Sequence, residues 1–211
     1  MTLKKMTVHE GLATIKLYEA KIKKEIRDLN VVSYKGKDKK IMDNGMTEKD
    51  WKEKGKAKYQ SVIDLINNRN AVKRAITKSN ATTTIEVGGK TYTVAEAIDM
   101  KSAIEFTEDL YAELSSQRTM AISRIAKENA RLHDEAIERS DAYLGSEKAD
   151  KTKLDEFIRD YEAPREYVLM EAINSDKEID TLYNEIANFN SEVDFRLSTS
   201  NALTVIEVEL A

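Results

Sequence analysis

The sequence KSNATTTIEV occupies residues 78–87, and a close copy, TSNALTVIEV, occupies residues 199–208. Aligned at an offset of 121 residues, the last nine residues of the two copies match at seven positions. Each copy follows a segment with apolar residues at helical spacing and then alternates with a period of two. The repeat therefore predicts, twice, a helix that ends at Asn80 or Asn201 in the left-handed conformation that Asn tolerates, followed by a strand.

The two predicted strands present matching faces. The residues assigned to strand pairing and core cover are Thr83, Ile85, Val87, Thr204, Ile206 and Val208. Gly88 and Gly89 suit the positive φ angles of a two-residue turn, which predicts a hairpin over about residues 82–94. An isolated hairpin is marginally stable in water, so we expect a C-terminal strand over about residues 203–210 to complete one small sheet. Its open edge leaves two alternatives, closure within one chain or pairing between chains.

Helical periodicity fills the first part of the chain. A capping box at Thr7 predicts a first helix that runs to about Asn30. A second helix is expected to restart at Thr47 and to run into the first copy of the repeat. Residues 31–46 contain two Gly and a run of Lys, so they are expected to form a loop between the two helices.

The second part of the chain predicts one very long helix and two shorter ones. A capping box at Thr93 begins a stretch of about 50 residues without Pro or Gly, which as a helix would span roughly 75 Å. A polar turn is expected at residues 145–153, and Pro164 is expected to break or kink the next helix. The last helix is expected to start near Ser175 with a third capping box.

Composition agrees with a mainly α protein. The 211 residues include seven Gly and one Pro, and 34% are charged, which favours long helices over a many-stranded sheet. We expect a single domain over residues 1–211, built as an elongated helical bundle with a small sheet.

Several function classes are disfavoured by composition. The chain has no Cys, which excludes disulfides, thiolate catalysis and Cys-ligated metal sites. Its apolar runs fall far short of the roughly 20 residues that a spanning helix needs, and no signal-peptide pattern is present, so we expect a soluble protein made in the cytoplasm. A net charge of −4 argues against general coating of nucleic acid.

Two motifs and the long helices carry a resemblance to a known family. SNATTTIEVGGKTYTVAEAI at residues 79–98 and FNSEVDFRLSTSNALTVIEVEL at residues 189–210 resemble helical virion-associated proteins of phages that infect Gram-positive bacteria. More distantly they resemble septicolysin-like proteins. The resemblance implies an oligomer-forming virion protein, synthesised in the host cytoplasm, that binds other copies of itself and other virion proteins and has no known catalytic residues. The septicolysin-like relatives would imply membrane damage, which leaves a membrane-active lysin-like protein as a further alternative function, although the chain lacks a long amphipathic or apolar segment of the kind that inserts into a membrane.

No catalytic or metal-binding pattern stands out. The two histidines, His9 and His133, lack a second ligand at the three- or four-residue spacing of a helical metal pair. The chain has neither a phosphate-binding loop nor a nucleophile elbow. We therefore expect no enzyme, no cofactor and no metal.

One segment suggests an alternative function. Residues 35–58 hold nine Lys against five acidic residues, with aromatic residues between them. Cations could contact phosphates and aromatic rings could stack on bases. The residues that would make these contacts are Lys37, Lys39, Lys40, Trp51 and Lys52. The absence of Arg weakens this alternative, because Arg supplies most bidentate contacts, so nucleic acid is a less favoured partner than protein. The preferred hypothesis is a non-enzymatic structural protein of a tailed-phage particle.

Overall fold

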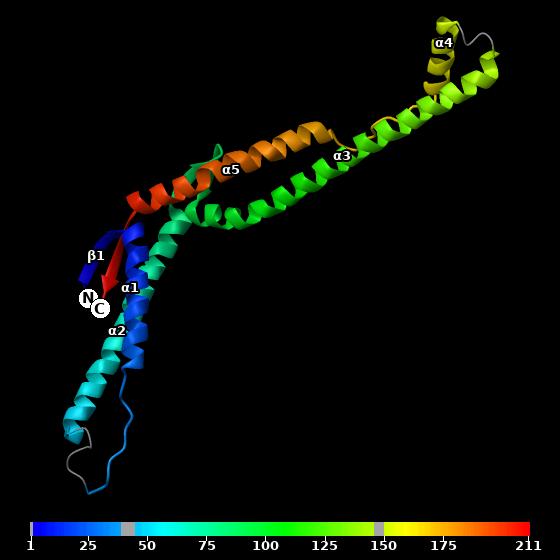
Figure 1. Cartoon of the computed structure of the whole chain (residues 1–211). Helices are drawn as coiled ribbons and strands as arrows, with labels where there is room; N and C mark the ends of the chain where they lie inside the picture. Colours follow the sequence, from blue (N-terminus) through cyan, green and yellow to red (C-terminus); the bar gives the residue numbers. More distant parts are fainter. Residues whose placement is uncertain (1, 39–44, 146–149) are drawn as a thin grey trace. The chain divides into compact units, whose positions relative to one another are not determined.

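A computed structural model describes residues 2–38, 45–145 and 150–211, and 74% of the described residues are helical. The prediction of a mainly α fold with a small amount of sheet is confirmed. Figure 1 shows the elements, which in chain order are β1 (Thr2–Thr7), α1 (Val8–Arg27), α2 (Glu48–Thr82), β2 (Thr84–Val87), β3 (Lys90–Thr93), α3 (Val94–Leu144), α4 (Lys151–Glu162), α5 (Ser175–Leu203) and β4 (Val205–Leu210).

The chain forms two compact units. Unit 1 comprises residues 1–102 together with 188–211, and unit 2 comprises residues 103–187. Unit 1 contains all four strands, α1, α2, the start of α3 and the end of α5. Unit 2 contains the rest of α3, α4 and the first part of α5. The single domain expected over residues 1–211 stays a prediction, and each unit is described on its own below.

Capping boxes set the helix starts where the sequence places them. Thr7 is the N-cap of α1 with a complete capping box, and Thr47 is the N-cap of α2. The helix α3 runs unbroken for 51 residues. The start of α5 differs in detail, because Asn174 caps it: its Oδ1 accepts from the Lys177 N–H at 3.1 Å. The parts of the expected loop that are described, residues 31–38 and 45–46, lie outside helices and strands.

The helix ends in the two repeats were wrongly predicted. Asn80 and Asn201 lie inside α2 and α5, which continue for two more residues. Among the described residues, only glycines have a positive φ. Thr83 follows α2 with extended backbone, and its N–H still donates to the Ser79 carbonyl at 2.8 Å. A helix that continues directly into a strand needs no left-handed residue, which removes the role proposed for Asn.

The sheet also differs from the expectation. The C-terminal strand β4 does not join the hairpin; it pairs antiparallel with β1, and β2 pairs only with β3. Two separate two-stranded sheets therefore replace the one predicted. The strand β1 was missed because its sequence, TLKKMT, is short and places two Lys side by side, which masks the alternation that reveals a strand.

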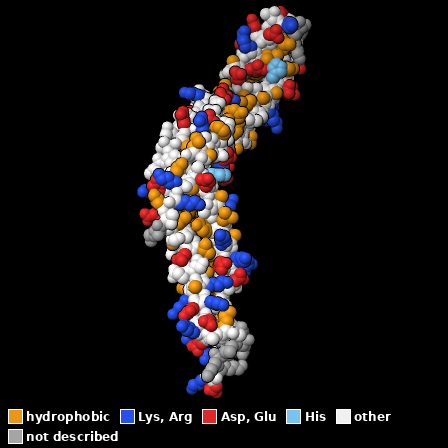
Figure 2. All heavy atoms as spheres, turned by 90° about the vertical axis from the view of Figure 1, so that its left-hand side faces the viewer, with side chains coloured by type: hydrophobic (Ala, Val, Ile, Leu, Met, Phe, Trp, Pro, Cys, Tyr) orange, Lys and Arg blue, Asp and Glu red, His pale blue; other side chains and the backbone are white. Residues whose placement is uncertain are grey.

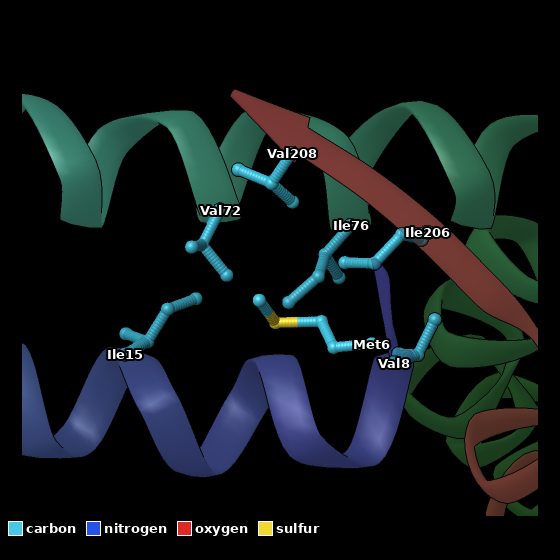
Figure 3. Close-up of a cluster of buried hydrophobic side chains, with 7 residues drawn as sticks. All are labelled: Met6, Val8, Ile15, Val72, Ile76, Ile206 and Val208. Atoms are coloured by element: carbon cyan, nitrogen blue, oxygen red, sulfur yellow. The ribbon is translucent and has the colours of Figure 1, made fainter. Parts of the chain in front are cut away.

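The core of unit 1 lies between α1, α2 and the β1–β4 pair. Figure 3 shows its side chains pointing toward one another from these four elements. The buried residues of this cluster are Met6, Val8, Ile15, Val72, Ile76, Ile206 and Val208. Burial of one such aliphatic side chain contributes about 1.5–3 kcal/mol, so β4 is held by its side chains as well as by its backbone.

We expect truncation of Ile76 to destabilise unit 1 strongly. Ile76 is 2% exposed within this cluster, and a buried Ile→Ala change costs about 2–5 kcal/mol because it removes apolar contacts and leaves a cavity. The matched control is Ile26→Ala on α1, where the side chain is 50% exposed and the loss should stay below about 1 kcal/mol. Urea unfolding followed by circular dichroism measures both, and equal losses would contradict the assigned core.

Candidate assembly interface

Two strand joints in unit 1 have the same construction. The β2–β3 joint consists of residues 79–98, and the β1–β4 joint consists of residues 2–12 and 200–211. In the first, Thr84 pairs with Thr93 and Val87 pairs with Lys90. In the second, the pairs at the corresponding positions are Val205 with Thr7 and Val208 with Lys4. The two pairs that lie between these ends also correspond. All four pairs of the β2–β3 joint therefore have the same register as their counterparts in the β1–β4 joint.

The connections between strands and helices are also the same. The Val94 N–H, at the start of α3, donates to the Thr83 carbonyl at 2.8 Å. The Val8 N–H, at the start of α1, donates to the Thr204 carbonyl at 2.9 Å. In both joints, the residue directly after one helix supplies the carbonyl that caps the start of another helix. This bond satisfies one of the free amides that every helix start presents.

Each joint carries a capping box on the helix that leaves it. The Thr93 N–H donates to Glu96 Oε2 at 2.7 Å, and the Thr7 N–H donates to Glu10 Oε2 at 2.7 Å. The return bonds, from the Glu N–H to the Thr Oγ1, measure 3.2 Å and 3.1 Å. Hydrogen bonds from the backbone and side chain of Thr93 hold the pKa of Glu96 below its usual value. The carboxylate form therefore makes this cap.

The structure reveals a second sequence repeat that complements the first. KKMTVHEGL at residues 4–12 aligns with KTYTVAEAI at residues 90–98, with Lys, Thr, Val and Glu identical. The offset is 86 residues, whereas the first repeat has an offset of 121. Aligning the sequences around the two capping boxes, at Thr7 and Thr93, is enough to identify this second repeat. Together the repeats divide the chain into a first half, residues 2–87, and a second half, residues 90–210, each with a strand at either end.

The buried side chains correspond between the halves. Val8 and Val94 are both buried at the start of their helices, and Val208 and Val87 are both buried in their strands. Gly11 and Ala97 occupy equivalent helix positions, and both are buried. A Cβ on Gly11 would lie 3.1 Å from Ile76 Cδ1. Gly11 therefore leaves room for the Ile76 side chain in the β1–β4 joint.

The six predicted pairing residues divide between strands and caps. Val87, Ile206 and Val208 are buried, and Ile85 is half-buried in β2. Thr83 and Thr204 precede the strands and supply the capping carbonyls described above. The structure places three of these residues in each joint, and it does not bring the two sets into one sheet.

The two joints differ in how their strands are connected. Gly88 and Gly89, with φ of 58° and 75°, link β2 to β3 directly. The Gly88 N–H donates to Glu192 Oε2 at 3.3 Å, and the ring of Tyr92 packs edge-on against Phe189 at 6.2 Å between centroids. These contacts fasten the β2–β3 joint to the end of α5.

In the β1–β4 joint the only peptide connection between the strands is residues 8–204. Lys5 and Glu207 are paired in the register, and their side chains form an ion pair at 2.8 Å. The hydrogen bond and charge of Glu207 raise the pKa of Lys5. Both side chains are more than half exposed, so the pair guides register more than it adds stability. The Ala211 N–H donates to Asn68 Oδ1 on α2 at 2.7 Å.

A pocket at the lysine-rich segment, residues 35–58, is lined by both aromatic and cationic side chains. Residues that line it include Trp51, Lys52, Lys56 and Tyr59. Glu48 forms ion pairs with Lys52 at 2.6 Å and with Lys35 at 3.0 Å. Hydrogen bonds first from Lys52 and then from Lys35 lower the pKa of Glu48 to about 2. One acidic residue thus offsets part of the positive charge of this segment.

The remaining residues predicted to contact nucleic acid are three lysines of the loop. Lys37 is exposed on the described part of the loop. Lys39 and Lys40 lie outside the described residues. The structure therefore places two of the five predicted residues, Trp51 and Lys52, in the lining of one pocket.

Polar contacts in unit 2 join α3 to α4. His133 Nδ1 lies 2.7 Å from Glu162 Oε1, and the Tyr161 hydroxyl donates to Glu135 at 2.8 Å. Desolvation and the hydrogen bond to Glu135 raise the pKa of Tyr161. Within residues 2–38, 45–145 and 150–211, no group of three or more His, Cys, Asp or Glu side chains could hold a metal ion. In the same residues, no helix has the length and apolar character needed to cross a membrane.

Comparisons with known proteins give no assignment. No family model, no curated protein and no solved structure matches the chain.

We expect Thr7→Ala and Thr93→Ala to cost similar amounts of stability, about 1 kcal/mol each, because they remove equivalent capping boxes. The matched control is Thr77→Ala, on the exposed face of α2, where the hydroxyl only donates to the Lys73 carbonyl within the helix. Urea unfolding of the three variants measures the losses. A loss at one cap with none at the other would contradict the equivalence of the two joints.

Proposed function

We propose that the chain is a non-enzymatic structural protein that acts by self-association and by docking to neighbouring subunits. The observation that carries this proposal is the exposure of large apolar side chains in unit 2. Contiguous exposed apolar surface marks sites of protein interaction, because water contact with it is unfavourable. Figure 2 shows hydrophobic side chains at the surface among charged ones.

Two segments of unit 2 contribute most of these side chains. On α3, Phe106 is 77% exposed and Leu110, one helical turn later, is 56% exposed. Between α4 and α5, Met170 is 90% exposed and Tyr167 and Val168 are more than half exposed. A second protein surface would remove this area from water at about 25 cal/mol per Å².

The particle that we propose is a tailed phage, and the virion is the proposed location. The support is the resemblance of residues 79–98 and 189–210 to helical virion-associated proteins. Proposed partners are other copies of the chain and other virion proteins. The long α3 helix suits such a role, because a helix of this length gives a partner many successive turns to pack against.

We expect the mass measured by light scattering to exceed the monomer mass of 24.0 kDa and to rise with protein concentration. The double variant Phe106→Gln with Leu110→Gln should shift the protein toward monomer, because it removes exposed apolar area from α3. The control is Glu105→Gln with Asp109→Gln, which places the same amide side chains at exposed polar positions of that helix. A wild-type monomer at all micromolar concentrations would contradict self-association.

A second candidate function is contact with nucleic acid. The observation that favours it is the pocket in which Trp51 and Tyr59 lie beside Lys52 and Lys56. Aromatic rings there would stack on bases while the ammonium groups contact phosphates. The ion pairs of Glu48 with two lysines work against it.

For this second candidate we expect single-stranded DNA to bind at low salt, with affinity that falls as salt rises. Gln at four lysines of the segment should weaken that binding by roughly tenfold or more, because each phosphate contact contributes to affinity. The four positions are Lys37, Lys39, Lys40 and Lys52. The control replaces four exposed lysines of α1 by Gln, at Lys16, Lys21, Lys23 and Lys24. Fluorescence anisotropy measures both, and no binding at low salt would exclude this candidate.

A further inference from the structure

We propose that the β1–β4 joint also forms between copies of the chain, with β4 of one copy paired to β1 of a second copy. This inference rests on the proposed self-association and names the surface and the partner. The partner is a second copy of this chain, and the surface is formed by the apolar side chains of α1, α2 and β1 that β4 packs against within one chain (Figure 3).

The two halves of the chain already meet as partners in both joints. The first half, residues 2–87, gives β1 to one joint and β2 to the other, and the second half gives β4 and β3. Each joint therefore contains one strand from each half. This is the reciprocal arrangement of a dimer in which the same contact is made twice.

Only one of the two joints is closed by a short connection. Gly88 and Gly89 tie a given first half to a given second half through β2 and β3. A two-residue link holds its strands together at an effective concentration far above that of any second copy. In the β1–β4 joint no such link exists, and 197 residues, 8–204, separate the two strands. Closing a longer connection costs more entropy than closing a two-residue turn, although this cost grows slowly with length.

The strand β4 itself carries the side chains and backbone groups through which it binds β1 and α2. Ile206 and Val208 point into the core cluster, and backbone pairing covers all six residues of β1. Lys5 and Glu207 fix the register, and Asn68 on α2 binds the end of the strand. A strand that adds to a sheet edge with alternate side chains in pockets is a recognised mode of peptide recognition.

Exchange preserves every one of these contacts. The α1, α2 and β1 elements of a second copy offer β4 the same pockets as those of its own chain. The change needed is at the connection between α5 and β4, where Leu203 is exposed and Thr204 has left the helix. Successive copies joined in this way associate head to tail, and such contacts build rings or filaments.

Cross-linking of two singly substituted chains tests the exchange. The chain has no Cys, so Lys5→Cys and Glu207→Cys each introduce one thiol. One population carries Lys5→Cys and is labelled with ¹⁵N, and the other carries Glu207→Cys. After equilibration, a short bis-thiol cross-linker is added and the products are resolved by mass. Exchange predicts a mixed dimer of intermediate mass, whose yield rises with protein concentration.

The other joint provides the matched control. Thr91 and Glu86 pair in the β2–β3 joint at the positions that Lys5 and Glu207 hold in the β1–β4 joint. The mixture of Thr91→Cys and Glu86→Cys chains should give at least roughly tenfold less mixed dimer, because the glycine turn keeps that pair within one chain. Each population alone measures the yield from random encounters.

The outcomes separate this inference from the proposed function. A mixed dimer specific to Lys5 and Glu207 supports strand exchange. Equal yields from the two mixtures, or none from either, overturn it. If light scattering of the wild-type chain shows an oligomer and the mixture gives no specific dimer, self-association stands and strand exchange fails. If the wild-type chain is a monomer throughout, both fail.

Discussion

Burial of alternate side chains from a paired strand is the interaction on which unit 1 depends. A two-stranded ribbon alone is marginally stable, because it buries little apolar surface. Here Ile206 and Val208 of β4 lie against Val72 and Ile76 of α2, so the backbone pairing with β1 is supported by a packed core. The strand positions in turn fix where α1 begins and α5 ends, through the bond from the Val8 N–H to the Thr204 carbonyl.

The same physical solution occurs twice in one chain. Both joints join a helix end, a strand pair and a capped helix start in one register, and small or β-branched residues are buried at equivalent positions. The repeats at residues 4–12 and 90–98 account for the strands and caps on one side of each joint. The two joints differ in the length of chain that connects their paired strands. Two glycines connect the strands of one joint, and most of the chain connects the strands of the other. That difference in connection is the basis of the proposed exchange of β4 between copies of the chain.

Much of the fold follows from local rules that sequence reasoning can apply. Capping boxes located the starts of α1 and α3, the glycine pair located the hairpin, and uninterrupted periodicity located the 51-residue helix. The burial of Val87, Ile206 and Val208 followed from their alternation. The strand β1 was missed because six residues with adjacent lysines carry little periodic signal. The left-handed Asn caps were wrong because a helix can pass into a strand through extended Thr residues.

The amino-acid sequence by itself determined which segments are helices, where β2, β3 and β4 lie and which faces of β2 and β4 are buried, because these depend on neighbouring residues and on period. Only the tertiary structure decided which strand pairs with which. An alternating pattern defines an apolar face but names no partner, and β4 meets that requirement as well on β1 as on the hairpin. The pairing of β4 with β1 depends on the surface that α1 and α2 form together, and no local segment encodes that surface.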